Sequence, residues 1–278
     1  MILSGKARLA GVLGWPVSHS RSPRLHGCWI ERHGLDAAYL PLPVEPERFA
    51  SAVTALRDLG FRGVNVTIPH KQAAFAICDQ LGAAARRTGS VNTLVFESDG
   101  IHGDSTDGYG FIENLNAGVP DWPRDRPAAV IGAGGAAAPV IDALVAAGVP
   151  EIRLINRTAT RADALAEQFG RKLRVCPWGD WDGLIRGAGL VVNATALGMT
   201  GQPPLPPVLH AASAQAVVTD LVYAPLVTPL LAEARAAGLR TVDGLGMLLH
   251  QARPGFKAWF GVEPAVDQEL RDFVLGTP

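Results

Sequence analysis

Residues 128–158 read AAVIGAGGAAAPVIDALVAAGVPEIRLINRT, and this stretch decides the fold. It opens with an apolar run of strand length at 128–131 and passes through the glycine-rich segment 132–136. An Ala/Val/Leu-rich stretch of helical character follows to Ala147, and a second apolar run of strand length occupies 151–155. Strand, helix and strand within about 30 residues predict a βαβ unit with parallel strands.

The glycine-rich segment has the composition that a dinucleotide site needs. Gly132 allows a tight turn out of the strand, Gly134 lets a pyrophosphate approach the backbone, and a small residue after it lets the helix pack closely. The N–H groups of the first helical turn then face the phosphates. A glycine-rich turn without a ligand is the alternative for so short a pattern. The predicted cofactor contacts are Gly132, Ala133, Gly134, Gly135 and Ala136.

The end of the second strand distinguishes between the two dinucleotide cofactors. NAD-binding folds place a carboxylate there for the ribose 2′-hydroxyl. This chain has Asn156-Arg157-Thr158 instead, with Arg161 one turn later and no Asp or Glu between them. Because guanidinium groups bind phosphate through two parallel hydrogen bonds, we predict NADP as the cofactor and these four residues as its contacts. Solvated surface arginines are the alternative.

Composition limits the other classes of function. The chain has 278 residues, of which 48% are hydrophobic and 18% charged, and its formal net charge is −1. The length suggests two domains, and the near-neutral charge argues against nucleic acid or an anionic membrane as a partner. Three scattered cysteines offer no disulfide or metal spacing, and we find no signal peptide or membrane span. We therefore expect a soluble, cytoplasmic, metal-free protein with a small-molecule substrate.

Strand and helix patterns alternate along the whole chain. Expected strands are 8–13, 38–44, 61–66, a hairpin of 91–96 with 101–103, then 128–131, 151–155, 172–176, 190–193, 216–222 and 240–242. Expected helices are 22–33 with Ser22 as its N-cap, 46–59, 69–81, 106–115, 137–147, 159–169, 180–187, 228–237 and the stretches from 244 onward. The predicted fold class is α/β with two domains. An N-terminal α/β substrate domain comprises 1–105 plus 244–278, and a Rossmann-type doubly wound nucleotide domain comprises 106–243.

Polar residues gather where the predicted N-terminal strands end, at 18–22, 65–71, 92–93 and 104–107. Each group alone can be explained by helix caps, turns or solvated charges. Ligands of open α/β sheets bind at the carboxyl ends of the strands, so four such groups at one edge indicate a site.

These stretches resemble the shikimate dehydrogenase family, and further matching stretches follow in the same order along nearly the whole chain. They are Gly14-x-Pro16-x-x-His19-Ser20-x-Ser22-Pro23-x-x-His26, Asn65-Val66-Thr67-x-Pro69-x-Lys71, Gly89-x-Val91-Asn92-Thr93, Thr106-Asp107-Gly108, Gly132 to Ala136, Asn156-Arg157-Thr158, Asn193-Ala194-Thr195 and Asp243-Gly244-x-Gly246-Met247-Leu248-x-x-Gln251-Ala252. The chain departs from the usual pattern at Gly27, Ser105 and Ala196, none of which is a proposed catalytic group.

The resemblance implies a reversible, NADPH-dependent reduction of 3-dehydroshikimate to shikimate, a step of aromatic amino-acid biosynthesis. It implies that Lys71 and Asp107 form the catalytic pair, and it adds Leu221 and Gly244 to the cofactor contacts. The implied substrate-binding residues are Ser20, Ser22, Thr67, Lys71, Asn92, Asp107, Tyr223 and Gln251. We expect a monomer or a homodimer.

The residue types also suit this chemistry on their own. When a hydride reaches a ketone carbon, the oxygen needs a proton and a positive neighbour; Lys71 offers both, and Asp107 can orient it. Hydroxyl and amide side chains pair with buried ring hydroxyls. We expect His19 and His70 to be structural.

Three other functions remain as alternatives. A quinate/shikimate dehydrogenase of broader specificity is commonly linked to NAD, which the arginines after the second strand disfavour. A C1-folate dehydrogenase has the same two-domain shape but gives no reason for the pair Ser20 and Ser22. An NADP-binding module without turnover needs neither Lys71 nor Asp107.

Overall fold

The computed structural model describes residues 2–206 and 208–276. The chain divides into two compact units: unit 1 is Met1–Asp107 with Leu248–Pro278, and unit 2 is Gly108–Met247. The chain passes between the units inside two helices, α5 (Asp107–Gly118) and α10 (Leu245–Phe260). No helix in the described ranges combines the length and apolar character needed to span a bilayer.

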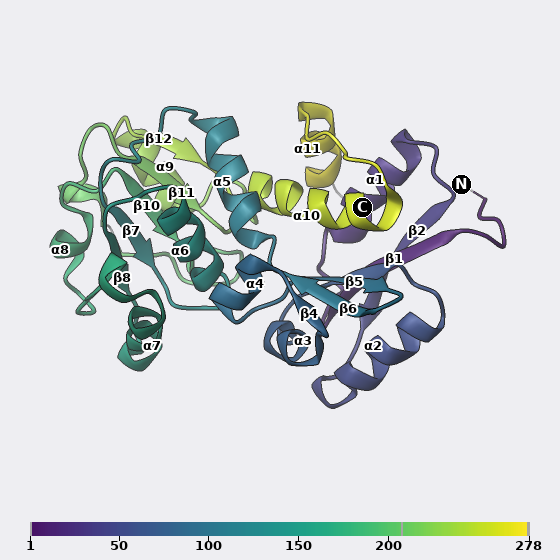
Figure 1. The fold of residues 1–278 in the computed structure, drawn as a ribbon. Helices are drawn as coiled ribbons and strands as arrows, with labels where there is room; N and C mark the ends of the chain where they lie inside the picture. The colour runs from purple at the N-terminus through teal and green to yellow at the C-terminus, as the bar shows by residue number, and fades with distance from the viewer. Residues whose placement is uncertain (1, 207, 277–278) are drawn as a thin grey trace. The chain divides into compact units, whose positions relative to one another are not determined.

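Unit 2 holds a six-stranded sheet in the order β12-β11-β10-β7-β8-β9, with every pair parallel. Its strands are β7 (Ala128–Ile131), β8 (Ile152–Ile155), β9 (Leu173–Cys176), β10 (Leu190–Asn193), β11 (Val217–Asp220) and β12 (Arg240–Val242). Its other helices are α6 (Ala137–Ala146), α7 (Ala159–Phe169), α8 (Trp181–Ile185) and α9 (Pro229–Ala236). The order reverses between β7 and β10, so the predicted doubly wound Rossmann-type sheet is confirmed (Figure 1).

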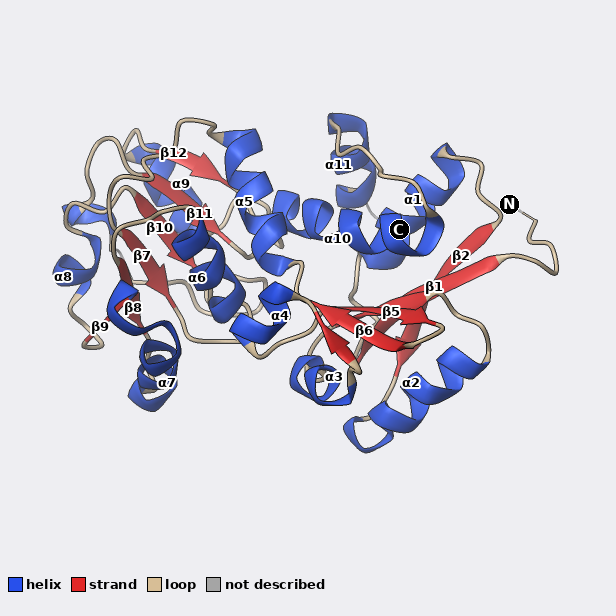
Figure 2. Ribbon diagram, in the orientation of Figure 1, coloured by secondary structure: helices blue, strands red, loops and turns tan. Residues whose placement is uncertain are grey.

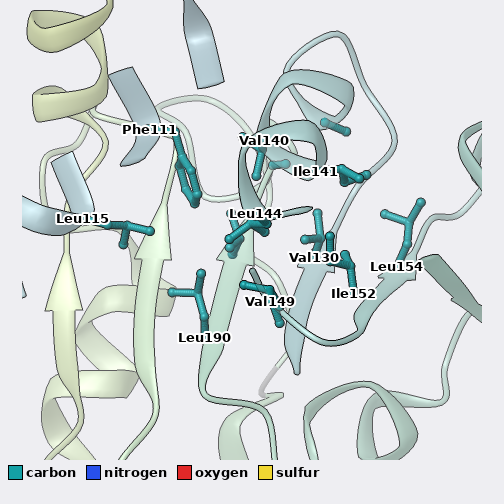
Figure 3. Close-up of a cluster of buried hydrophobic side chains, with 14 of the residues drawn as sticks. Phe111, Leu115, Val130, Val140, Ile141, Leu144, Val149, Ile152, Leu154 and Leu190 are labelled. Carbon is teal, nitrogen blue, oxygen red and sulfur yellow. The ribbon is translucent and has the colours of Figure 1, made fainter. Parts of the chain in front are cut away.

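The core of unit 2 lies on both faces of this sheet. Val130 of β7 packs on one face with Phe111 of α5 and Leu144 of α6 (Figure 3). Its chain neighbour Ile131 packs on the other face with residues of α8 and α9 such as Leu231. Because successive strand residues point to opposite faces and helices cover both, the central strands β7 and β10 are almost entirely apolar. This property made them easy to predict.

Unit 1 holds a mixed six-stranded sheet in the order β2-β1-β3-β5-β6-β4. Its strands are β1 (Arg8–Gly14), β2 (Ala37–Pro43), β3 (Gly63–Val66), β4 (Gln80–Leu81), β5 (Thr93–Glu97) and β6 (Gly100–Asp104). β1 is parallel to β2 and β3, β5 is antiparallel to β3 and β6, and β4 is parallel to β6. The hairpin predicted from the sequence is the pair β5 and β6.

Helices cover both faces of the unit 1 sheet. They are α1 (Ser22–Arg32), α2 (Phe49–Asp58), which follows the 3-10 turn η1 (Pro46–Arg48), α3 (Lys71–Ile77), α4 (Ala83–Thr88), the end of α10, and α11 (Gln268–Leu275). Figure 2 shows α1, α10 and α11 on one face and α2 with α3 on the other.

Two local predictions are wrong. The helix expected at 69–81 covers only Lys71–Ile77, because Asp79 and Gly82 instead donate backbone hydrogen bonds to Ile101 and Gly103 beside β6. That pairing creates β4, and α4 follows it. In addition, Ser22 is not an N-cap: α1 begins at Ser22, and Arg21 occupies the cap position without a side-chain capping bond.

Candidate active site

Lys71 and Asp107, the predicted catalytic pair, form an ion pair in unit 1. Each is the first residue of its helix, Lys71 of α3 and Asp107 of α5, and their side chains are 20% and 10% exposed. The preceding residue, His70, is buried; one ring nitrogen lies 2.8 Å from the carbonyl oxygen of Val44, and the ring stacks on Phe49. This anchoring fixes the start of α3 and agrees with a structural role for His70.

Asn92 links the ion pair to Gln251, another predicted substrate residue. Its Nδ2 donates to Oδ1 of Asp107 across 2.8 Å and lies 3.2 Å from Oε1 of Gln251 in α10. Its Oδ1 accepts from the N–H of Thr106 at 2.8 Å and from the hydroxyl of Thr93 at 3.0 Å. These bonds fix the amide so that its donors, rather than its oxygen, face the carboxylate of Asp107.

A buried polar pair, Asn65 and Tyr39, supports Asn92, and of the two only Asn65 belongs to the polar groups predicted to indicate the site. Asn65, near the end of β3, donates to the carbonyl of Asn92 and to Thr93 Oγ1, both at 3.1 Å. The hydroxyl of Tyr39 in β2 donates to Asn65 Oδ1 at 2.6 Å. Burial raises the pKa of Tyr39 well above its ordinary value, against the opposing effect of a hydrogen bond with Ser22. Asn65 lies in one of the quoted motifs, whereas no pattern in the sequence points to Tyr39.

His26 stacks on Tyr39, with 3.9 Å between the ring centroids and 1° between the planes. The rings of Trp29, Phe256 and Trp259 surround it, and it is fully buried. Burial lowers the pKa of His26 to about 3, so the imidazole is neutral at physiological pH. His26 is therefore a core residue of the wall behind the site.

The remaining predicted substrate residues of unit 1 follow the carboxyl ends of β1 and β3. Thr67 comes directly after β3, and its N–H donates to the carbonyl of Leu13 at 2.9 Å. Gly14 permits this approach, since a Cβ there would lie 2.6 Å from Thr67 Cγ2. Ser20 is half-buried in the loop after β1, and Ser22 is buried at the start of α1. Tyr223 lies elsewhere, in the unit 2 segment that follows β11.

In unit 2, the loop after β7 fits a dinucleotide. Gly132 has φ +107°, and a Cβ there would lie 2.5 Å from Thr195 Cγ2, so only glycine suits the turn. At Gly135 an added Cβ would meet nothing within 4 Å, which leaves the loop open to a ligand beside the start of α6. Asn156 accepts from the N–H of Ala133 at 3.0 Å and donates to the carbonyl of Thr158 at 2.8 Å. It thereby joins the glycine-rich loop to the arginine-bearing loop.

Arg157 and Arg161 are exposed on the loop after β8 and on the first turn of α7. Among the residues that the structure describes, neither side chain has an ion-pair partner, so both guanidiniums are available to a phosphate group. These two guanidiniums therefore suit NADP, with its additional phosphate, better than NAD.

The two other predicted cofactor residues of unit 2, Leu221 and Gly244, lie against each other. A Cβ on Gly244 would be 2.5 Å from the Leu221 carbonyl oxygen.

A buried polar cluster, of which only Asn193 belongs to a quoted motif, supports the same edge of the unit 2 sheet. Asn193 at the end of β10 donates to Asp220 Oδ1 at 2.9 Å, and the hydroxyl of Thr228 donates to Asp220 Oδ2 at 2.7 Å. Burial raises the pKa of Asp220, and the hydrogen bonds from Thr228, Asn193 and the N–H of Val222 oppose this effect. The cluster orders the segments that follow β10 and β11.

Comparison with known proteins decides the family. Residues 12–94 match the family model of the shikimate dehydrogenase substrate-binding domain, and residues 121–245 match that of shikimate/quinate 5-dehydrogenase. The chain belongs to the shikimate dehydrogenase family.

Individual members of the family are similar over almost the full length. The shikimate dehydrogenase (NADP(+)) of Rhodospirillum rubrum is 56% identical, with 100% of both chains covered. The crystal structure of Thermus thermophilus shikimate 5-dehydrogenase in complex with NADP(H) and shikimate is 39% identical, with a TM-score of 0.85 over 96% of this chain and 98% of that chain. Quinate dehydrogenase of Corynebacterium glutamicum in complex with NAD is 31% identical, with a TM-score of 0.89 over 97% and 99%.

Proposed function

We propose that this protein catalyses the reversible reduction of 3-dehydroshikimate to shikimate by NADPH, a step in the synthesis of aromatic amino acids. The observation that carries the proposal is the cluster of half-buried Lys71 with buried Asn92, Asp107 and Gln251, joined by direct hydrogen bonds in unit 1. A binding module has no need of a lysine held against a carboxylate beside two amides. The family membership and the NADP-specific name of the Rhodospirillum rubrum relative support the same function.

The residues of unit 1 bind the substrate and supply the proton. Ser20 and Ser22 bind the carboxylate, while Thr67, Asn92 and Gln251 bind the ring hydroxyls. Buried hydroxyls require such partners, since an unpaired one costs about 1–3 kcal/mol. Tyr223, which lies in unit 2, is the further substrate-binding residue that we propose.

The residues of unit 2 hold the cofactor. The backbone N–H groups at 134–136 would bind the pyrophosphate, and Arg157 with Arg161 would bind the 2′-phosphate. When bound, NADPH supplies the hydride for the ketone carbon. Lys71 then donates a proton from Nζ to the oxygen that becomes the hydroxyl, and its positive charge stabilises the developing alkoxide. Asp107 keeps Lys71 oriented through their ion pair, and the Lys71 amine, neutral after this transfer, takes up a proton from solvent to restore the pair.

The experiment that tests this function measures the absorbance of the reduced nicotinamide with four pairs of reactants. Shikimate and quinate are each offered with NADP and with NAD. We expect the largest kcat/KM for shikimate with NADP. Quinate with NAD as the best pair would favour the broader-specificity alternative, and no turnover with any pair would contradict the proposal.

We also propose that the protein acts in the cytoplasm, as a monomer or homodimer. Cys28, Cys78 and Cys176 are all free thiols, which is typical of proteins from reducing compartments. Burial raises the pKa of each of these thiols, so none is poised to react. Light scattering of the purified protein tests the oligomeric state.

A further inference from the structure

The loop that carries the two serines is tied to the last helix of the chain. Arg21 lies between Ser20 and Ser22, and its guanidinium donates to the carbonyl of Val274 across 2.6 Å. Arg24, one turn further along α1, donates to the carbonyl of Phe273 across 2.5 Å. Both acceptors belong to the last turn of α11.

These carbonyls are groups that a helix cannot satisfy by itself. The last four carbonyls of an α-helix lack an intrahelical N–H partner and form the negative end of its dipole. In α11 the N–H of Gly276 donates to the carbonyl of Asp272, and the two arginines take the next two carbonyls. The serine loop is thus held by charge-assisted hydrogen bonds, which are short and directional.

The opposite ends of α1 and α11 are joined independently. Arg32, at the end of α1, pairs with Asp267 and Glu269 at the start of α11, both at 3.0 Å. The indole N–H of Trp29 donates to the carbonyl of Ala265 at 3.0 Å. Because these contacts fasten α11 to α1 without Arg21, the bond from Arg21 to Val274 has a local effect, on the loop that contains it.

We propose that Arg21 is a positioning residue for substrate binding, which holds Ser20 and Ser22 in place by anchoring their loop to the C-terminal end of α11. The proposal rests on the proposed function, in which the serines bind the substrate carboxylate. Within the loop, the N–H of Ser20 donates to the carbonyl of Val17 at 3.0 Å, and the N–H of Ser22 donates to Ser20 Oγ at 3.3 Å. Arg21 adds the anchor outside the loop.

The first test is kinetic. Arg21→Met keeps the aliphatic part of the side chain and removes the guanidinium donors that bind the Val274 carbonyl. Without this anchor, the loop that contains Ser20 and Ser22 becomes ordered only when the substrate binds, and this ordering costs binding free energy. Ordering one residue of backbone changes affinity by about tenfold, and we expect KM for shikimate to rise by about that factor. We expect kcat and KM for NADP to stay within about twofold, since Lys71 and the cofactor contacts are unchanged. Arg21→Lys, which keeps a charged donor, should recover most of the loss.

The matched control is Arg32→Met, which removes a guanidinium from the same helix at its far end. We expect it to lower the thermal midpoint and leave KM for shikimate unchanged. Equal effects of Arg21→Met and Arg32→Met on KM would overturn the proposal, because they would show that only the docking of α11 matters.

A double-mutant cycle separates positioning from direct attraction of the substrate by charge. In a Ser20→Ala/Ser22→Ala background, Arg21→Met should change KM by less than about twofold, since the groups that it positions are gone. If the effects of the serine and arginine changes multiply instead, Arg21 acts on the substrate directly and the proposal is wrong.

Hydrogen exchange tests the anchor without any substrate. We expect the amides of residues 17–22 to exchange faster in Arg21→Met than in the wild type or in Arg32→Met, while β1 exchanges as before. Unchanged exchange at 17–22 would contradict the anchoring. A wild type without shikimate turnover would contradict the proposed function, and the exchange experiment would still decide the role of Arg21 in the loop.

Discussion

Asn92 and Asp107 are joined by a hydrogen bond of 2.8 Å, from the side-chain amide of Asn92 to Oδ1 of the carboxylate, while Lys71 binds Oδ2. The two carboxylate oxygens therefore have different partners, and the carboxylate cannot rotate without breaking both contacts. Thr106 and Thr93 in turn hold the Asn92 oxygen. The direction in which Lys71 presents its amine thus depends on Asn92.

Asn92→Ala should lower kcat/KM for shikimate by about 10- to 150-fold, since a hydrogen bond to a charged group contributes about 1.5–3 kcal/mol. Both kcat and KM should change, because Asn92 supports Asp107 and, in the proposed function, also contacts the substrate. The matched control is Asn114→Ala in unit 2, where a buried amide donates to the carbonyl of Asp243 at 2.7 Å. A variant of Asn92 that is destabilised as much as the control but keeps its kcat/KM would show that Asn92 is only structural.

Replacing Arg157 and Arg161 by alanine should raise KM for NADP by about 30- to 1000-fold, since their proposed contacts to the 2′-phosphate would contribute about 2–4 kcal/mol. KM for NAD should stay near its wild-type value, because NAD lacks that phosphate. The control is Arg171→Ala, an exposed arginine just after α7. Steady-state kinetics with both cofactors check the prediction, and an equal loss with NADP and NAD would refute the assignment of the two arginines.

The stability of unit 1 should fall at acid pH because of His26. Its pKa is lowered from 6.5 to about 3 by burial. Above pH 6.5 both the folded and the unfolded states hold it neutral, so it has no effect there. Between pH 6.5 and about 3 the unfolded chain binds a proton that the folded chain does not, and the free energy of unfolding falls by up to about 1.4 kcal/mol per pH unit.

His26→Phe should remove this dependence, because phenylalanine cannot titrate. Thermal midpoints followed by tryptophan fluorescence report on the change, as Trp29 and Trp259 lie against the His26 ring. The wild type should lose more stability than His26→Phe between pH 7 and 5, a difference of about 2 kcal/mol. Parallel pH profiles would mean that His26 is protonated in the folded protein.

The sequence could predict those parts of the fold that are set by local pattern. β7 and β10 begin and end at the predicted residues, because an apolar run covered on both faces is visible without knowledge of its neighbours. β4 could not be found this way, since its two residues become a strand only by pairing with β6, about 20 residues away in the chain. The helical pattern expected at 69–81 was locally reasonable, and a non-local contact overrode it.

In the site, too, residues in local motifs could be predicted, whereas contacts between distant parts of the chain could not. Lys71, Asn92, Asp107 and Gln251 stand in recognisable motifs, and the structure joins them by hydrogen bonds, although their roles in catalysis stay predictions. Tyr39 had no signal, because an isolated tyrosine in a strand is indistinguishable from a core residue until its hydroxyl is seen to reach Asn65. The bond from Arg21 to Val274 joins residues 253 positions apart in the chain, a separation that no local pattern reveals.

The role of Lys71 is the central claim, and comparison of kcat for Lys71→Ala with the wild type tests it most directly. Loss of a general acid–base group lowers kcat by about 10²–10⁴-fold, and KM for shikimate should change much less. We therefore expect slow but measurable oxidation of shikimate by NADP, with the fold intact by circular dichroism. A variant that keeps more than about a tenth of the wild-type kcat would contradict the assignment of Lys71 as the proton donor.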